Sequence, residues 1–311
     1  MDVMEWLLEG DPAIRWQVLR DLADAPPDEV AAERARVARE GWGAELLALQ
    51  DADGRWDGGT YRPGWAPEDR PFFDAWTSTH FSLQALMEFG LDPVSPEARR
   101  AVGRVRDGVR WEHEDEPYFD GEVEPCINGV ALAIAAYFGE GGDPIVGTLL
   151  EWHLPDGGWN CWAPYGVRVS SFHSTICALE GLLAWERAGG ESTDAAAARR
   201  AGEDYLLDRA LRNRRSTGEI ADPRFAMASY PVRWYYDVLR GLDHLRIADR
   251  RDPRLAPAVE LIRAKRRDDG RWARELHHEG PQLIDVGSDE GRPSRWITLR
   301  ALRVLRWWDA G

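Results

Sequence analysis

The sequence has few cysteines, no long apolar run and a deficit of positive charge. Three cysteines spread over 311 residues, an odd number, do not make a disulfide framework, so we expect a reduced, cytoplasmic protein. A membrane-spanning helix needs an apolar run of about 18 residues or more, and the sequence contains none. The first residues, MDVMEWLLEGDP, lack the basic segment and cleavage site of a secretory signal, so none is expected.

Acidic side chains outnumber basic ones, 54 Asp and Glu against 39 Lys and Arg, which gives a net charge of −15. Nucleic acid and anionic membrane surfaces repel such a protein, so neither is expected as a partner. Hydrophobic residues make up 44% of the chain, which is typical of a globular protein able to bury a large core. The 16 tryptophans are unusually many, and such rings line cores or ligand pockets.

Helical patterns of two kinds alternate along the chain, and no period-2 segment indicates a strand. Buried helices are expected to begin near residues 12, 74, 126, 171, 232 and 294, with amphipathic, solvent-facing helices between them. Turns of the form Gly-x-Trp follow three of the solvent-facing helices, at residues 53–56, 156–159 and 269–272. This is an internal repeat of helix pairs.

The matched numbers of apolar and solvent-facing helices favour a closed ring. We therefore predict an all-α fold, an (α/α)6 toroid, as one domain over residues 1–311 with residues 1–50 as its first helices. An open solenoid is the alternative. In a toroid the apolar helices run parallel, so their N-terminal ends meet at one mouth. The predicted pocket opens there, rimmed by loops at residues 57–72, 112–123, 160–170 and 273–292.

The Gly-x-Trp turns resemble the QxxxGxW repeat of squalene and oxidosqualene cyclases. QDADGRW, ending at Trp56, matches the whole motif, whereas HLPDGGW and RRDDGRW, ending at Trp159 and Trp272, match only its second half. The β subunits of protein prenyltransferases use the same toroid. The resemblance implies the fold over most of the chain.

A second resemblance implies a Zn2+ site. Prenyltransferases hold zinc with Asp-x-Cys at one inner-helix start and a later His in a Phe/Tyr-His-Thr context. Here Glu124-Pro-Cys126 stands at an apolar helix start, and Phe-His173-Ser-Thr follows 47 residues after Cys126. Cys161 follows a solvent-facing helix, which in a toroid returns the chain to the mouth where the apolar helices begin. The expected zinc ligands are therefore Glu124, Cys126, Cys161 and His173. The alternative is a pair of buried free cysteines and a hydrogen-bonded core histidine.

Two differences from the prenyltransferase and cyclase patterns argue against assigning the activity of either family to this protein. Acidic residues fill the region just before Glu124, where prenyltransferases place Arg and Lys to hold a diphosphate. The Asp-x-Asp-Asp acid motif of the cyclases is also absent.

Further candidates lie at the starts of the apolar helices. Arg233 and Arg295, each beside a tryptophan, are expected to hold a ligand carboxylate or phosphate; the alternative is pairing with the protein's own acids. Expected pocket walls are Trp76, Trp234, Tyr235 and Trp296, with core packing as the alternative. The expected acid-base residues are Asp237 and His80.

These observations lead to three functional hypotheses. The first is a zinc-dependent enzyme of the prenyltransferase or terpene-cyclase class, acting on a small hydrophobic, isoprenoid-like substrate in a tryptophan-lined cavity. The second is a metal-free isoprenoid cyclase or isomerase that uses a carboxylic acid. The third is a non-catalytic lipid-binding or scaffold protein. The sequence does not indicate an oligomeric state.

Overall fold

The computed structural model describes residues 2–67, 69–70, 74–287 and 289–311, and this part of the chain is all-α. It contains isolated β-bridges but no strand among the described residues, which confirms the predicted fold class. The α-helices, in chain order, are α1 (Val3–Leu8), α2 (Pro12–Asp21), α3 (Pro27–Ala35), α4 (Gly41–Ala48), α5 (Thr79–Phe89), α6 (Pro96–Gly108), α7 (Pro125–Phe138), α8 (Asp143–Glu151), α9 (Phe172–Arg187), α10 (Thr193–Leu207), α11 (Val238–Ile247), α12 (Ala256–Ala264) and α13 (Arg295–Asp309).

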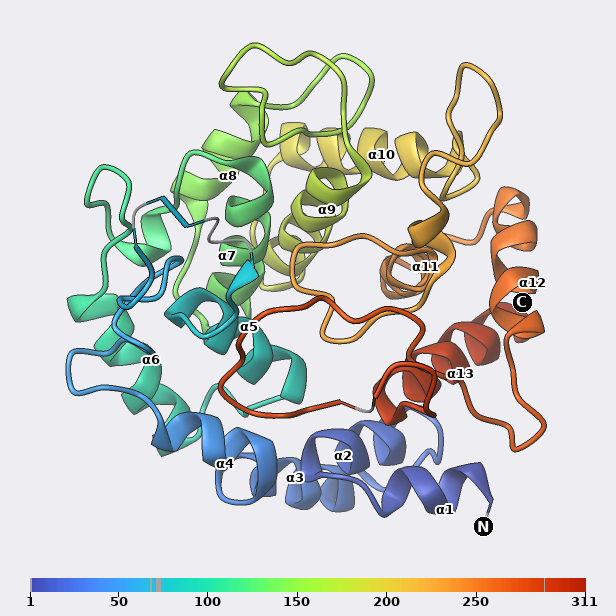
Figure 1. Cartoon of the computed structure of the whole chain (residues 1–311), viewed down its shortest axis with the longest axis horizontal. Coiled ribbons are helices and arrows are strands. Elements are labelled where there is room, and N and C mark those ends of the chain that lie inside the picture. Colours follow the sequence, from blue (N-terminus) through green and yellow to red (C-terminus); the bar gives the residue numbers. More distant parts are fainter. Residues whose placement is uncertain (1, 68, 71–73, 288) are drawn as a thin grey trace.

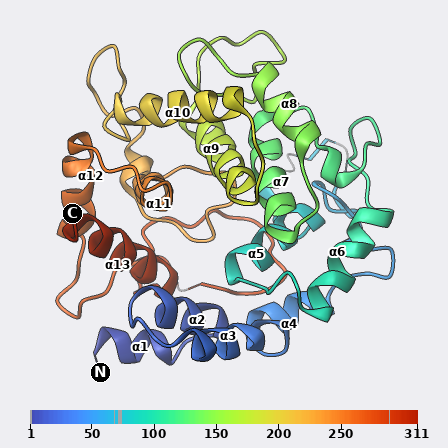
Figure 2. The same ribbon diagram turned by 180° about the vertical axis from the view of Figure 1, so that it is seen from behind.

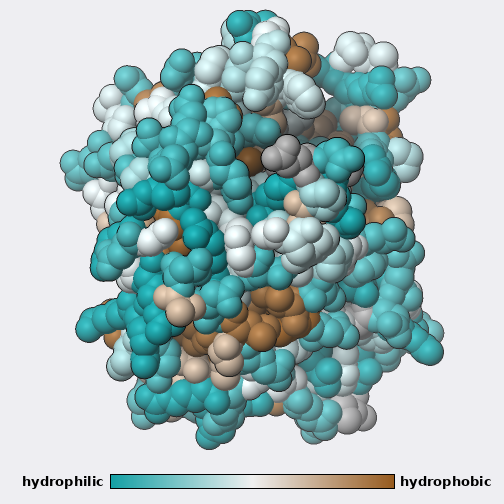
Figure 3. Space-filling model, turned by 60° about the vertical axis from the view of Figure 1, so that its left-hand side comes forward, coloured by the Kyte–Doolittle hydropathy of each residue, from teal (hydrophilic) through white to brown (hydrophobic). Residues whose placement is uncertain are grey.

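The helices follow one another around the molecule in chain order (Figure 1). Helices α5, α7, α9 and α11 lie nearer the centre, and α6, α8, α10 and α12 lie outside them, in both views (Figures 1 and 2). The last helix, α13, contacts α2, so the two ends of the chain meet. No helix of the described residues is both long enough and apolar enough to cross a bilayer. The face in Figure 3 is mostly hydrophilic, with one compact hydrophobic patch low on it.

The three Gly-x-Trp turns have the same hydrogen bonds. The indoles of Trp56, Trp159 and Trp272 are at most 2% exposed. Each indole N–H donates, over 2.7 Å, to a carbonyl ten residues earlier in the preceding helix, in α4, α8 and α12 respectively. Each turn therefore ties the end of an outer helix to the core, and the repeat read from the sequence is also a structural repeat.

A threonine at the start of the next inner helix completes the repeat. The backbone N–H groups of the three tryptophans donate to the hydroxyls of Thr79, Thr175 and Thr298, at 3.2, 3.0 and 3.0 Å. These hydroxyls are fully buried. The turn is thus fixed to the preceding helix through its indole and to the following helix through its backbone.

We expect Thr175→Val to lower the free energy of unfolding by about 1–3 kcal/mol, because it leaves the buried N–H of Trp159 without an acceptor. Urea denaturation measures the change. The matched control is Thr148→Val, since that partly exposed hydroxyl makes only a 3.4 Å bond within its own helix. The control should stay within about 0.5 kcal/mol of wild type. Equal effects of the two substitutions would contradict the role given to Thr175.

Helices α7 and α9 approach closely at two glycines. A Cβ added to Gly129 would lie 2.3 Å from the backbone of Cys177, and one added to Gly181 would lie 2.3 Å from the carbonyl of Gly129. Only glycine allows this approach. It brings the N-terminal ends of α7 and α9, with Cys126 and His173, to the same place.

Two inner helices begin later than the sequence predicts. Helix α5 begins at Thr79 rather than near residue 74, because the backbone N–H of Trp76 donates to the carbonyl of Pro281 in the last long loop. Helix α11 begins at Val238 rather than near residue 232. The expectation that Arg233 lies in the first turns of a helix is therefore wrong, and its φ of 53° is not helical.

Candidate functional site

A cavity of about 640 Å3 lies at the N-terminal ends of α7 and α9. It brings together four predicted metal ligands and one predicted wall residue with residues of the 160–170 loop. Its lining consists of Tyr61, Glu124, Cys126, Ile127, Asn160, Cys161, Trp162, Tyr165, Ser171, His173, Ser174 and Trp234. Residues 68, 71, 72 and 288 of the predicted rim loops lie outside the described residues.

Glu124, Cys126 and Cys161 form one group of potential metal donors. One ligand atom from each lies within 4.8 Å of the other two. The sulfur of Cys126 lies 3.8 Å from Oε2 of Glu124. The two cysteines are joined by a disulfide in the structure. The prediction that these residues lie close together is confirmed, but the prediction of reduced cysteines is wrong for Cys126 and Cys161 in this structure.

The turn that carries Cys161 is held by the first turn of α9. Ser174 accepts a hydrogen bond from the backbone N–H of Cys161 at 3.0 Å, and its hydroxyl lies 3.2 Å from the Cys161 sulfur. The backbone N–H of Cys126 points to the same sulfur at 3.3 Å. The position of Cys161 is therefore fixed from both α7 and α9.

His173 lies in the same cavity, but one of its ring nitrogens is already used. The backbone N–H of Tyr236 donates to Nδ1 of His173 at 2.8 Å. Burial lowers the pKa of this imidazole to about 4, so it is neutral at pH 7. A neutral ring that accepts at Nδ1 carries its proton on Nε2. His173 thus offers an N–H donor to the cavity, which does not suit a zinc ligand, since a ligand binds through a bare nitrogen.

Glu124 is partly buried and is close enough to the carboxylate of Glu122 to be affected by its charge. Burial and the neighbouring Glu122 raise the pKa of Glu124 to about 7. Glu122 has a raised pKa for the same main reason, burial. A carboxyl group with a pKa near 7 can act as a general acid, and the charge of a cation there would favour its ionised form.

Aromatic rings form the walls of the cavity. Trp234 stacks on Tyr235 at 3.8 Å between ring centroids, and Tyr235 stacks on His278 at 3.7 Å. Trp162 and Tyr165 lie at the rim with 65% and 63% of their surface exposed. Of the predicted wall residues, Trp234 lines this cavity, whereas Tyr235 only stacks on Trp234 and does not line it.

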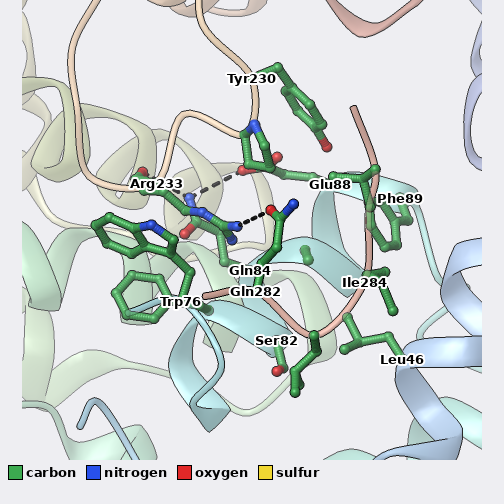
Figure 4. A pocket seen from close by; sticks show the side chains of 15 residues that line it. Leu46, Trp76, Ser82, Gln84, Glu88, Phe89, Tyr230, Arg233, Gln282 and Ile284 are labelled. Atoms are coloured by element: carbon green, nitrogen blue, oxygen red, sulfur yellow. Dashed lines mark hydrogen bonds between the residues drawn. The ribbon is translucent and has the colours of Figure 1, made fainter. Parts of the chain in front are cut away.

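Arg233 and Trp76 line a separate, small pocket (Figure 4). The Arg233 guanidinium donates to Oε1 of Gln282 at 3.3 Å and lies 5.5 Å above the Trp76 ring. The indole N–H of Trp76 donates to the carbonyl of Glu279. The free volume is only about 20 Å3, which holds about one water molecule. The structure leaves no room there for a ligand carboxylate or phosphate.

Arg295 and Trp296 also lie apart from the candidate site. The guanidinium of Arg295 donates to the carbonyl of Trp6 at 2.9 Å and packs over the Trp6 ring at 4.6 Å. Trp296 stacks on Tyr230 at 4.5 Å. The arginines predicted to hold one ligand thus face different parts of the protein.

Asp237 caps helix α11. One oxygen accepts from the backbone N–H of Arg240 at 2.8 Å, and the other accepts from the backbone N–H and hydroxyl of Ser229, at 3.2 and 2.9 Å. With 2% exposure and both oxygens bonded, this carboxylate has a structural role. It does not line the candidate cavity.

His80 is enclosed by aromatic rings and is 2% exposed. Its Nδ1 lies 3.1 Å from the Tyr118 hydroxyl, and the Trp111 ring lies 5.6 Å away. Burial lowers the pKa of this imidazole to about 3. A group this far from solvent packs the core, and the structure gives it no access to the cavity.

Because the pKa of native His80 is about 3 and that of an unfolded histidine is about 6.5, the unfolded state binds more protons between these pH values. Stability is therefore lost as pH falls from 6.5 towards 3. We expect His80 alone to cost about 2 kcal/mol at pH 5, so His80→Gln should reduce the loss between pH 7 and pH 5 by that amount. Urea unfolding at the two pH values measures this. His113→Gln, half-exposed, is the control and should keep the full wild-type loss. An unchanged loss in His80→Gln would contradict the prediction.

Several cavity residues were not singled out from the sequence: Tyr61, Ile127, Asn160, Trp162, Tyr165, Ser171 and Ser174. The only available signal was their position in or beside the predicted rim loops. Loop length and polarity predict a rim, but they do not say which side chains turn inward.

No protein-family model matches the chain, and no curated protein matches it. A search of solved structures found four matching chains. One, described as the crystal structure of a protein from Actinoplanes, has 18% sequence identity, covers 96% of this chain and 90% of that one, and gives a TM-score of 0.47. A similarity of this size supports no statement about function.

Proposed function

We propose that this protein is a zinc-dependent enzyme acting on a small hydrophobic, isoprenoid-like molecule in the 640 Å3 cavity. The observation that carries the proposal is the group of Glu124, Cys126 and Cys161, with donor atoms within 4.8 Å of one another at an aromatic cavity. Thiolate and carboxylate are both good zinc ligands.

The fold proposed with it is a single-domain (α/α)6 toroid related to prenyltransferases and squalene cyclases. The inner ring would be α2, α5, α7, α9, α11 and α13. Supporting observations are the structural repeat at the three tryptophans and the contact between α13 and α2. The cavity then stands at the mouth where inner helices begin, beside the positive ends of α7 and α9.

Three protein ligands leave a fourth position open, as in catalytic rather than structural zinc sites. When bound there, zinc supplies a Lewis acid for a substrate oxygen or lowers the pKa of a water. His173 would donate a hydrogen bond from Nε2–H to an oxygen in the cavity. Trp162, Tyr165 and Trp234 would exclude water and bind the apolar part of the substrate.

Zinc requires thiolates, so the reduced protein should bind the metal and the disulfide form should not. We expect about one zinc per chain, by elemental analysis, in protein purified under reducing conditions without a histidine tag or chelator. The same protein oxidised to the disulfide before exposure to zinc should hold less than roughly 0.2 per chain. Reduced protein that also holds less than this, with no gain in melting temperature on adding zinc, would reject the proposal.

A metal-free cyclase or isomerase is the second candidate, and Glu124 favours it. Its carboxyl group has a pKa of about 7 at the aromatic cavity and is better placed as a general acid than Asp237. Incubation with polyprenyl substrates distinguishes the two. Full activity of Cys126→Ser, with loss of activity in Glu124→Gln, would select the metal-free mechanism.

A further inference from the structure

A second cavity, of about 350 Å3, lies among the inner helices at the opposite end from the candidate site. Its rim includes Arg187 and Ile247, the last residues of α9 and α11. Cys126 and His173 lie instead in the first turns of α7 and α9. The two cavities have no lining residue in common.

The walls of this cavity are of two kinds. Apolar side chains of α5, α7 and α9 form one side: Met87, Val130, Ala133, Leu183 and Ala184. Helix α13 contributes Trp296, Arg300 and Arg303 on the other. These three are spaced by four and three residues and so lie on one face of the helix.

Arg300 has an unusually incomplete set of partners. Its side chain is 12% exposed, yet it makes no hydrogen bond with any residue in the described part of the chain. Its one ion pair there is Nε to Oδ2 of Asp243, at 3.5 Å. Asp243 is already bonded to Arg246 at 2.8 Å. A guanidinium has five N–H donors, and no Arg300 nitrogen is both fully buried and unbonded, so these donors are accessible from the cavity.

The other acids around the cavity are not hydrogen-bonded to Arg300. Glu180 is held by Nε and Nη2 of the Arg240 guanidinium, at 2.9 and 2.6 Å. Asp237 and Glu88 attract Arg300 electrostatically without a hydrogen bond. The Arg300 guanidinium therefore keeps hydrogen-bond donors that no carboxylate of the described residues uses.

Two further charged groups are already paired, whereas Arg187 donates to the backbone carbonyl of Ile247. Arg303 pairs with Asp21 and donates to Gln17. His244, which also lines the cavity, lies 3.3 Å from Glu203.

We propose that this cavity binds a small organic carboxylate with a hydrocarbon body, its carboxylate on Arg300 and its chain against the apolar wall of α5, α7 and α9. An arginine and a carboxylate match in charge and in planar geometry. A cavity of roughly 150 Å3 accepts benzene, so 350 Å3 has room for a medium-length alkyl chain. This site does not depend on the proposed zinc enzyme.

Isothermal titration calorimetry of the full-length protein with octanoate tests the proposal. Arg300→Gln should weaken octanoate binding at least about tenfold. Arg306→Gln is the matched control, since Arg306 stands on the same helix, is 45% exposed and pairs with Asp24; it should change the Kd less than about twofold. Octylamine, with the same chain, and inorganic phosphate, with no chain, should bind at least about tenfold more weakly than octanoate.

A second variant tests the location of the binding site without changing any charged residue. Ala133→Leu places a larger side chain in the apolar wall and should also weaken octanoate binding at least about tenfold. The proposal is overturned if octanoate fails to bind at millimolar concentration, if octylamine or phosphate binds as well, or if octanoate binding is unchanged in both folded variants. Circular dichroism melting confirms folding of each variant.

Discussion

Replacing Arg240 with methionine is expected to lower the free energy of unfolding by about 3–5 kcal/mol. Arg240 is 1% exposed and holds Glu180 through two hydrogen bonds. It also donates to the carbonyls of Arg233 and Tyr235, which precede the capped start of α11. Methionine fills similar space but leaves the Glu180 carboxylate without its partner and the Tyr235 carbonyl without a donor, whereas the Arg233 carbonyl keeps its bond from Gln84.

Urea denaturation at pH 7 measures the loss, with Arg106→Met as the control. Arg106 also forms two ion pairs, with Asp107 and Glu140, but its side chain is 55% exposed. Surface pairs contribute little, so the control should lose less than about 1 kcal/mol. A loss below about 1 kcal/mol in Arg240→Met would show that the buried pair does not hold α9 to α11.

The second large effect concerns the proposed zinc site. Cys126→Ser should reduce zinc affinity more than about 100-fold, because it removes one of three ligands. His173→Gln should keep zinc affinity within about threefold of wild type, since Nδ1 of His173 is bonded to Tyr236. Competition with a chromogenic chelator under reducing conditions measures both.

Cys177→Ser is the matched control for the cysteine variant. Cys177 is fully buried in α9, is not in the donor group, and its sulfur contacts the Trp234 carbonyl at 3.6 Å. The Cys177→Ser variant should bind zinc with the affinity of the wild-type protein. Equal losses in the Cys126 and Cys177 variants would point to damage to the fold, and a large loss in His173→Gln would restore His173 as a ligand.

Local signals predicted most of the fold. Helical periodicity placed the helices, and the Gly-x-Trp turns marked where outer helices end, because the same indole-to-carbonyl bond recurs in each repeat. The alternation of helices also predicted that Cys126 and Cys161 lie close together, and they do.

Features set by distant contacts were missed. The late start of α5 depends on a bond from Trp76 to Pro281, more than 200 residues away in sequence. Which ring nitrogen of His173 carries the proton depends on a hydrogen bond from the backbone N–H of Tyr236, 63 residues later in the sequence. The start of α11 was missed for a local reason. Asp237 before an apolar run is an ordinary signal for a helix N-cap, but the sequence pattern also included the three aromatic residues before it in the helix.

The arginines show a further limit of sequence patterns. Arg233 and Arg295 share a local motif with a following tryptophan, yet one reaches Gln282 and the other reaches Trp6. Arg300, in the middle of α13, was not singled out, although it has fewer protein partners than either neighbouring arginine of that helix. Side-chain partners come from tertiary packing, which the motif does not encode.

X-ray absorption at the zinc K edge tests the central claim most directly. The sample is the reduced full-length protein with one equivalent of zinc. The account predicts two sulfur ligands at about 2.3 Å, from Cys126 and Cys161, and oxygen ligands at about 2.0–2.2 Å that include Glu124. It also predicts no imidazole scattering, because His173 keeps its proton on Nε2. A zinc ion with no sulfur ligand, or one bound mainly by imidazole, would contradict the proposed site.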